Sequence, residues 1–418
     1  MGLSKEIKAL RDEIVEYRRR FHMYPEVSNK EYETANFIVS ELEKMGVKVV
    51  KQGTQPQEIV KEIYTNNDKK TVTIQGESLP GVVGLIEGKY PGKTVAIRAD
   101  MDALAVEEKN DVPYRSKKQG VMHACGHDAH MAMALGVAAY LSKQKDQMKG
   151  NVKLIFQPAE EYVGGAVPMI RDGVLENPKV DAIFGLHMDP GYKTGEIGIS
   201  YGETMASSDR LIIKINGKST HGASPHQGID AVVIAGQALV AMQAVMSRMK
   251  SPLESGVLSF GTIHGGEQPN SIAEEVVIRG ILRTFKPEVR EKAIEDIYKV
   301  LKGVTEAFGG SFEFTREKSY DSLCNDKKMV EFLKETAKDI IGEENIKELE
   351  KPRTIVEDFA YYLQEVPGAF MFLGTGNEEK DSCHPLHSSQ FNIDEDSLEI
   401  GVAIMSAVIM KYLNQDFV

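Results

Sequence analysis

The chain has no tryptophan and only three cysteines among its 418 residues: Cys125, Cys324 and Cys383. So small and odd a number argues against a disulfide framework and favours a reducing compartment, so we expect a cytoplasmic protein. The apolar runs that we identify are shorter than the roughly 18 residues of a membrane-spanning helix, and we expect no membrane partner. The first twenty residues also lack the apolar stretch of a secretory signal.

Positive charge is the scarcer of the two signs. The chain has 50 Lys and Arg against 62 Asp and Glu, which gives a formal net charge of −12. Nucleic-acid binding draws most of its affinity from clustered basic residues that neutralise phosphates, so we expect no nucleic-acid partner. The length allows two or three domains with sizeable cores.

The periodicity of apolar residues predicts an α/β domain in the first part of the chain. Helical spacing covers residues 3–20 and 30–45, and a further helix starts near His127. Short apolar runs rich in β-branched residues alternate with the helical stretches, at 82–86, 94–99, 152–156 and 182–186. This alternation predicts a mixed, largely parallel sheet between helices, completed after residue 321 by a segment ending in a helix at 395–412.

A different pattern begins near residue 200. Strand-like runs at 211–216, 257–263, 276–285 and 311–315 enclose helical stretches at 230–249 and 288–308. The order β-α-β-β-α-β is that of a ferredoxin-like unit. We therefore predict a catalytic domain in two parts, 1–200 and 318–418, interrupted by an inserted α+β domain over 201–317. The polar stretch 51–77 reads as an excursion with one short strand at 71–74, and its role is open.

The densest chemical signal is His123-Ala-Cys-Gly-His-Asp-Ala-His130, just before the predicted helix. Thiolate and imidazole bind borderline metals such as zinc, manganese, cobalt and nickel. Cys125 and His127 are the candidate ligands in this stretch. The alternative is a capped helix start with structural histidines, which a single histidine would favour but such a cluster does not.

Metal-capable side chains also follow other strands. Glu160 and Glu161 come after the strand at 152–156, and His187 ends the run at 182–186. Open α/β sheets form their sites at the carboxyl ends of strands. One glutamate can bind a metal while the other takes a proton from water, although a Glu-Glu pair alone is usually a solvated loop. His387 stands in a turn-rich stretch before the last helix.

Two carboxylates and three polar side chains complete the candidate site. Asp100 and Asp102 follow the strand at 94–99 and could orient ligand histidines, or simply cap a turn. In the inserted domain, His221 and Asn270 could donate hydrogen bonds to a developing oxyanion. Arg283, on a strand, could bind a substrate carboxylate. Turn chemistry and an ordinary ion pair are the competing interpretations of Asn270 and Arg283.

Taken together, these stretches resemble the aminoacylase and zinc-carboxypeptidase superfamily, in particular its amidohydrolase branch of hippurate hydrolases, indoleacetyl-amino-acid hydrolases and N-acyl-amino-acid amidohydrolases. The matching stretches follow the family's order over nearly the whole chain: 19–26, 98–104, 123–130, 156–161, 184–187, 220–226, 356–359 and 387–389.

The resemblance implies a site for two divalent metal ions, most readily manganese or zinc, with cobalt or nickel as options. The implied ligands are Cys125, His127, Glu161, His187 and His387, with Cys125 bridging the two ions. It further implies Glu160 as general base, Arg283 as the carboxylate anchor, and His221 and Asn270 as groups that serve the transition state. Because the family's inserted domain often dimerises, we expect a homodimer or homotetramer in which these two residues act across the interface.

We therefore predict a metallohydrolase that cleaves the amide bond of N-acyl amino acids, releasing a carboxylic acid and a free amino acid. A dipeptidase or carboxypeptidase of the same superfamily shares the mechanism and remains an alternative, as does an N-acetyl-diaminopimelate deacetylase. A non-enzymatic metal-binding protein is a third alternative. Glu160 beside Glu161 argues against it, because a closed structural zinc site needs no adjacent free carboxylate.

Overall fold

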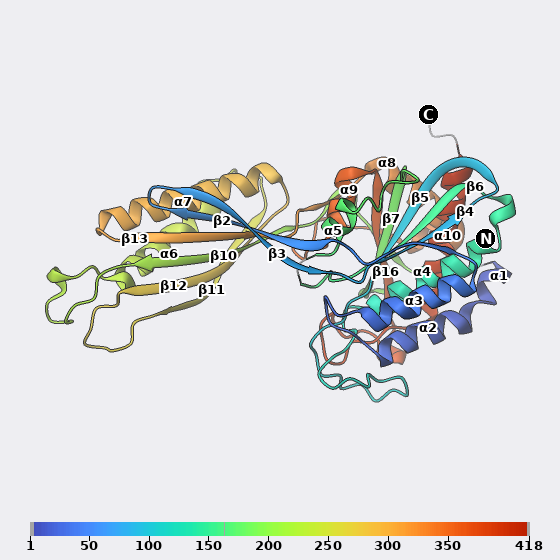
Figure 1. Ribbon diagram of the computed structural model, residues 1–418, viewed down its shortest axis with the longest axis horizontal. Helices are drawn as coiled ribbons and strands as arrows, with labels where there is room; N and C mark the ends of the chain where they lie inside the picture. Colours follow the sequence, from blue (N-terminus) through green and yellow to red (C-terminus); the bar gives the residue numbers. More distant parts are fainter. Residues whose placement is uncertain (1–3, 163, 416–418) are drawn as a thin grey trace.

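The computed structural model describes residues 4–162 and 164–415 and has two domains side by side along its longest axis (Figure 1). The larger domain contains both ends of the described chain, and the smaller is reached by strands that leave the larger domain and return to it. The catalytic α/β domain and an α+β domain expected from the sequence are both present. The predicted boundaries at residues 200 and 317 stay a prediction.

The larger domain is built on a mixed sheet of eight strands. Its central strands β6, β5, β7 and β16 run parallel to one another, and antiparallel strands flank them. The order across the sheet is β1 (Lys48–Gln52), β4 (Val82–Glu87), β6 (Lys149–Gln157), β5 (Tyr90–Asp100), β7 (Ala182–Lys193), β16 (Gly368–Gly376), β8 (Ile197–Ile199) and β15 (Ile346–Glu348). The central strands are buried on both faces, as their continuous apolar runs predict.

Helices cover both faces of this sheet. The largest apolar cluster joins one face to α1 (Lys5–Lys8), α2 (Arg11–Met23), α3 (Tyr32–Lys44), α4 (His127–Ser142), α8 (Lys327–Ile341) and α10 (Asp396–Asn414). A separate cluster joins the opposite face to α5 (Ala166–Arg171) and α9 (Ala360–Glu365). The single helix expected over 3–20 is two helices, α1 and α2, and Leu3 lies outside the described residues.

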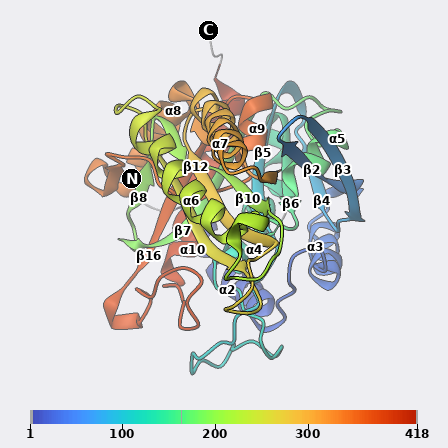
Figure 2. The same ribbon diagram turned by 90° about the vertical axis from the view of Figure 1, so that its left-hand side faces the viewer.

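The smaller domain is an antiparallel sheet with two helices on one face. Its strands lie in the order β11 (Gly256–Gly265), β12 (Glu275–Thr284), β10 (Ser207–Asn216), β13 (Ser311–Lys318), β2 (Pro56–Thr65) and β3 (Lys69–Ser78). Helices α6 (Ala231–Arg248) and α7 (Pro287–Ala307) lie side by side on it (Figure 2). A two-stranded ladder of β9 (Gly202–Met205) and β14 (Leu323–Asn325) lies on the chain segments that connect the two domains.

The polar stretch 51–77 differs from its prediction. Instead of one short strand it forms a long hairpin, β2 and β3, and β2 pairs with β13 of the smaller sheet. The hairpin was not evident in the sequence because every residue of β3 is exposed, so the strand has no apolar face and no periodic pattern. A segment from early in the chain therefore extends the ferredoxin-like unit by two strands.

One helix of the described chain, α6, is long and apolar enough to cross a membrane by length and composition alone, which the inspection of apolar runs did not identify. Its buried residues are spaced as on a helix that lies against a sheet: Ala231, Ile234, Ala235, Ala238, Met242 and Val245. These side chains belong to the core of the smaller domain.

Candidate metal centre and active site

The candidate site lies at one edge of the larger sheet, where β5 and β6 end beside β7. Asp100 is the last residue of β5, Gln157 is the last residue of β6, and His187 lies in β7. Because parallel strands end at the same edge, these chain segments converge there. Helix α4 starts at the same place, and Gly126 precedes it with a φ of 92°. A Cβ at Gly126 would lie 3.1 Å from Met188, so glycine permits the close approach of the Cys125 turn to β7.

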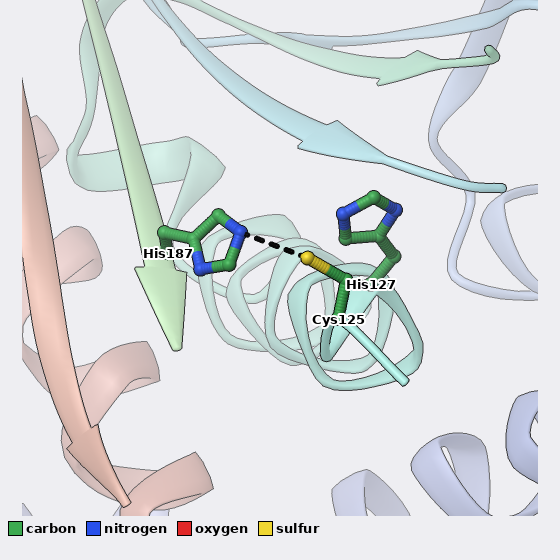
Figure 3. Close-up of side chains that lie close together, drawn as sticks. All are labelled: Cys125, His127 and His187. Atoms are coloured by element: carbon green, nitrogen blue, oxygen red, sulfur yellow. Dashed lines mark hydrogen bonds between the residues drawn. The ribbon is translucent and has the colours of Figure 1, made fainter. Parts of the chain in front are cut away.

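Three predicted ligands form a compact buried group (Figure 3). Cys125 Sγ lies 3.4 Å from His187 Nε2, and one ligand atom from each of Cys125, His127 and His187 lies within 4.8 Å of the others. A second group has the same spacing and consists of Cys125, Glu161 and His387, in which His387 Nε2 lies 3.2 Å from Glu161 Oε1. Cys125 belongs to both groups.

These residues fit a pair of metal ions. Within the described chain, His127 Nε2 is a buried atom without a hydrogen-bond partner, which is costly unless another ligand binds it. Two groups that share one sulfur provide positions for two neighbouring ions with a common ligand. Thiolate with imidazole and carboxylate suits borderline divalent metals such as zinc or manganese.

Several residues of the site have strongly shifted pKa values. Burial, and then the charges of Glu161 and Glu160, raise the pKa of the Cys125 thiol. Burial lowers the pKa of His187, whereas at His127 the effect of burial is outweighed by Asp100 and Asp102, which raise its pKa to about 10. Beside burial, the raised pKa values of Cys125 and His127 reflect negative charge gathered in this space, which a bound cation would neutralise.

Asp100 and Asp102 make different contacts in the site. Asp102 positions His127 through its backbone carbonyl, 2.8 Å from His127 Nδ1, while its carboxylate accepts the N–H groups of Glu160 and Glu161. Asp100 lies 2.6 Å from Nδ1 of His130, and its carboxylate is 3.7 Å from His127 Nε2. The orienting role predicted for Asp100 thus involves chiefly His130, a residue of the histidine cluster that was not assigned as a ligand.

Glu160 lies in a buried carboxylate group that sequence reasoning missed. Glu160, Glu357 and Asp358 each offer an oxygen within 4.8 Å of the others. Burial, and then the charges of Glu357, Glu161 and Asp358, raise the pKa of Glu160 well above its usual value. The signal was present in the stretch 356–359, which carried the family resemblance, but nothing in the sequence gave the stretch a role.

A buried arginine balances these carboxylates. Arg98 on β5 lies 2.6 Å from Asp358, 2.9 Å from Glu357 and 2.5 Å from Asp100. An arginine within an apolar strand run is a recognisable signal, because a buried cation requires partners. The sequence could therefore have identified Arg98, but its partners are far away in the chain.

A cavity of about 370 Å³ opens beside the cluster. Arg283 of β12 reaches it, and within the described chain Arg283 Nη1 is buried without a hydrogen-bond partner. The remaining lining combines the acidic and metal-capable residues with apolar ones: Cys125, Glu160, Glu161, His187, His387, Met205, Tyr320, Ile355, Val356 and Leu386. The cavity thus offers an unsatisfied cation, apolar walls and the candidate metal ligands within one space.

His221 and Asn270 lie elsewhere. The N–H of Gly222 donates to the carbonyl of Asn270 at 2.7 Å, so the two loops lie together. They follow β10 and connect β11 to β12, at the end of the smaller domain remote from the larger sheet (Figure 1). Both side chains are exposed, and neither lines the cavity. Their predicted catalytic role stays a prediction.

The fold and the site together define a two-domain hydrolase of amide bonds, and comparison with known proteins agrees. The family model described as Peptidase family M20/M25/M40 matches residues 96–411. The chain is 37% identical to Thermostable carboxypeptidase 1 of Saccharolobus solfataricus, over 99% of this chain and 98% of that protein. It is also 37% identical to N-acetyl-L-cysteine deacetylase of Bacillus subtilis, over 94% of this chain and 86% of the relative.

A solved structure supports the same relationship. A Bacillus subtilis protein described as a dinuclear metal binding peptidase from the M20 family superimposes with a TM-score of 0.78 and 30% identity, covering 97% of this chain and 99% of that one. The chain belongs to peptidase family M20/M25/M40, as the sequence resemblance predicted.

Proposed function

We propose that this protein is a metal-dependent amidohydrolase that cleaves N-acyl amino acids into a carboxylic acid and a free amino acid. The observation that carries the proposal is the buried Arg283 Nη1, which has no hydrogen-bond partner among the described residues and belongs to a residue that lines the cavity beside the metal-capable cluster. A guanidinium there matches the α-carboxylate of the amino acid. The apolar part of the lining suits an acyl group.

The residues divide the chemistry between them. Cys125, His127, Glu161, His187 and His387 would hold two divalent ions, with manganese or zinc the first candidates. Such ions supply Lewis acidity, which polarises the amide carbonyl and acidifies water. Glu160, buried at the cavity wall, takes a proton from the attacking water and returns it to the leaving nitrogen. Arg283 fixes the amino acid, which orients the scissile bond.

A dimer completes this scheme. His221 and Asn270 are too remote in the fold to act on the cavity of their own chain, so we infer that they serve the site of a second subunit. Apolar side chains exposed on α6 and on the edge strand β11 support this domain as the contact surface: Val232, Val233, Val240, Val257 and Ile263. Exposed apolar side chains on a helix and an edge strand of one domain are typical of a protein interface.

We also propose a cytoplasmic location. All three cysteines lie in the described part of the chain and none forms a disulfide bond there, which suits a reducing compartment. Fractionation of cells with an antibody to the protein tests the location directly.

Carboxypeptidase activity is the second candidate, because two relatives carry that name. A peptide with a free carboxylate would use Arg283 in the same way and would differ only in what occupies the apolar side. The deciding experiment is a panel of N-acetyl, N-benzoyl and indoleacetyl amino acids and of peptides, assayed with protein stripped of metal and reloaded with manganese, zinc, cobalt or nickel. Metal-restored hydrolysis confined to peptides would reject the proposal in favour of a peptidase.

Glu160→Gln tests the mechanism. The amide keeps the size of the side chain but cannot shuttle a proton, so we expect turnover to fall by at least about 100-fold. Metal content, measured by elemental analysis, should stay near that of the wild type, because Glu160 is not among the proposed ligands. Full activity in the variant would refute the role of Glu160.

A further inference from the structure

The turn that carries the two glutamates is held from several sides. Ala159 has a φ of 58°, a left-handed conformation that is unfavourable for a non-glycine residue. Its N–H donates to Glu31 Oε1 at 2.8 Å. The N–H groups of Glu160 and Glu161 donate to the two carboxylate oxygens of Asp102 at 3.0 and 2.9 Å. Buried carboxylates of the larger domain therefore account for all three N–H groups of the turn.

The carbonyl of Glu160 has a hydrogen-bond donor that comes from the segment following the smaller domain's strand β13. It accepts a hydrogen bond from the hydroxyl of Tyr320, a buried residue that also lines the cavity. Tyr320 follows β13 of the smaller domain, and its own carbonyl accepts the N–H of Ser208 on β10 at 2.8 Å. Its backbone is thus bonded to the smaller domain while its hydroxyl reaches the catalytic turn of the larger one.

The segment on either side of Tyr320 leaves it little freedom. Arg290 of α7 pairs with Asp321 and also binds Asp209 at 2.7 Å, so the residue after Tyr320 is tied to the core of the smaller domain. The ring of Tyr320 also packs closely on the loop that follows Glu161, because a Cβ at Gly164 would lie 2.9 Å from Tyr320 Cε1. A displacement of the smaller domain would therefore pull on the Glu160 turn.

We propose that Tyr320 is a positioning residue that ties the smaller domain to the Glu160 turn. The tie holds the carboxylate of Glu160 in its working orientation only while the two domains keep their arrangement. The hydroxyl proton of Tyr320 is committed to the Glu160 carbonyl, so Tyr320 acts through Glu160. The inference rests on the proposed function, in which Glu160 is the general base.

Tyr320→Phe removes the hydroxyl and keeps the ring. The matched control is Tyr361→Phe, because the Tyr361 hydroxyl donates to the carbonyl of Ser319 at 2.9 Å in the same region without bonding the glutamate turn. We expect kcat of Tyr320→Phe to fall about 10- to 100-fold with KM changed less than about twofold, since misplacing a reacting group costs rate rather than binding. The control should keep its kcat, and both proteins should keep wild-type metal content.

Hydrogen exchange gives a readout that does not depend on activity. Amides of residues 159–161 should exchange faster in Tyr320→Phe than in the wild type, and at the wild-type rate in Tyr361→Phe. Unchanged kcat and exchange in Tyr320→Phe, or equal losses in both variants, would overturn the proposal. If the wild type cleaves peptides but no N-acyl amino acid, the proposed substrate class is wrong. The role of Tyr320 is then tested by the kcat for peptides and by the exchange comparison.

Discussion

At the scale of single residues, the cavity is marked by a charged group that lacks a full set of partners within the described residues. Arg283 is the clearest case, because burial and the nearby Arg210 lower its pKa while one of its nitrogens finds no hydrogen-bond acceptor in the described chain. Burying a guanidinium without its full set of hydrogen bonds costs desolvation free energy, which an anionic ligand can offset. This imbalance points to an anionic group on the substrate.

Arg283→Met should therefore raise KM for N-acyl amino acids by about 10- to 100-fold, because charge-assisted hydrogen bonds contribute about 1.5–3 kcal/mol. When the carboxylate of the same substrates is converted to an amide, we expect a high KM with the wild type. Arg283→Met should raise the KM for these amides little further. Steady-state kinetics on the two series measures the difference. The control is Arg210→Met, an exposed arginine on a neighbouring strand. An equal effect on both substrate series would argue against an anchoring role.

The raised pKa of His127 predicts how metal binding depends on pH. With a pKa of about 10 against an ordinary value of 6.5, His127 is protonated in the metal-free protein at neutral pH. This proton stabilises the metal-free fold fully below about pH 6.5, and the contribution is lost as pH rises through about 10. Only neutral imidazole binds metal, so binding must release the proton and affinity should fall at least about tenfold per pH unit from pH 8 to 6.

Calorimetric titrations of metal into metal-free protein test this dependence. Repeating them in buffers of different ionisation enthalpy counts the protons released. A pH-independent affinity with no proton release would mean that His127 is neutral before the metal binds.

At the scale of elements, the β2–β3 hairpin is the least expected feature. Strand β2 contributes Tyr64 to the core of the smaller domain, where its ring stacks on Phe314 with centroids 5.3 Å apart. Glu62 of the same strand lies 3.0 Å from the buried Arg316. Through these contacts the hairpin packs into the core of the smaller domain and is not a surface loop.

Tyr64→Ala should consequently lower the free energy of unfolding by about 3–5 kcal/mol, the usual cost of removing a large buried aromatic side chain. Tyr90→Ala is a suitable control because Tyr90 is 50% exposed. Urea unfolding followed by circular dichroism compares the two variants. If both lose the same small amount, the hairpin does not contribute to the core in the way that the packing indicates.

At the scale of the whole molecule, the distance between the cavity and the far end of the smaller domain sets a requirement for assembly. His221 lies at the end of the smaller domain remote from Glu160, yet both are proposed to act on one substrate. A dimer in which each smaller domain reaches the site of the other subunit resolves this separation.

Mixing two inactive variants tests the arrangement. Glu160→Gln and His221→Ala homodimers, unfolded together and refolded, should regain activity at about one quarter of the wild-type sites, because half of the dimers are mixed and each has one intact composite site. The control is each variant refolded alone. If the mixture stays inactive although mass spectrometry detects mixed dimers, the two residues do not act across the interface.

Much of this architecture was evident from the sequence. The period of apolar residues predicted the buried strands of the larger sheet and the β-α-β-β-α-β order of the smaller domain, because buried strands and half-buried helices impose their spacing on the residues. The candidate ligands were also recognisable: Glu161 and His187 follow or lie within strand runs that parallel pairing brings to one edge, and Cys125 and His127 stand where helix α4 begins. Chemistry of that density is rare outside metal sites.

The tertiary structure decided what the sequence could not. The hairpin at 56–78 joins the smaller sheet through pairing with residues about 250 positions away, and both faces of β3 are exposed, so no local period marked it. Arg98, Glu357 and Asp358 balance one another only because folding brings distant segments into one buried space. Whether a polar residue is a ligand, a support or a surface group depends on its neighbours in space, and the sequence orders residues only along the chain.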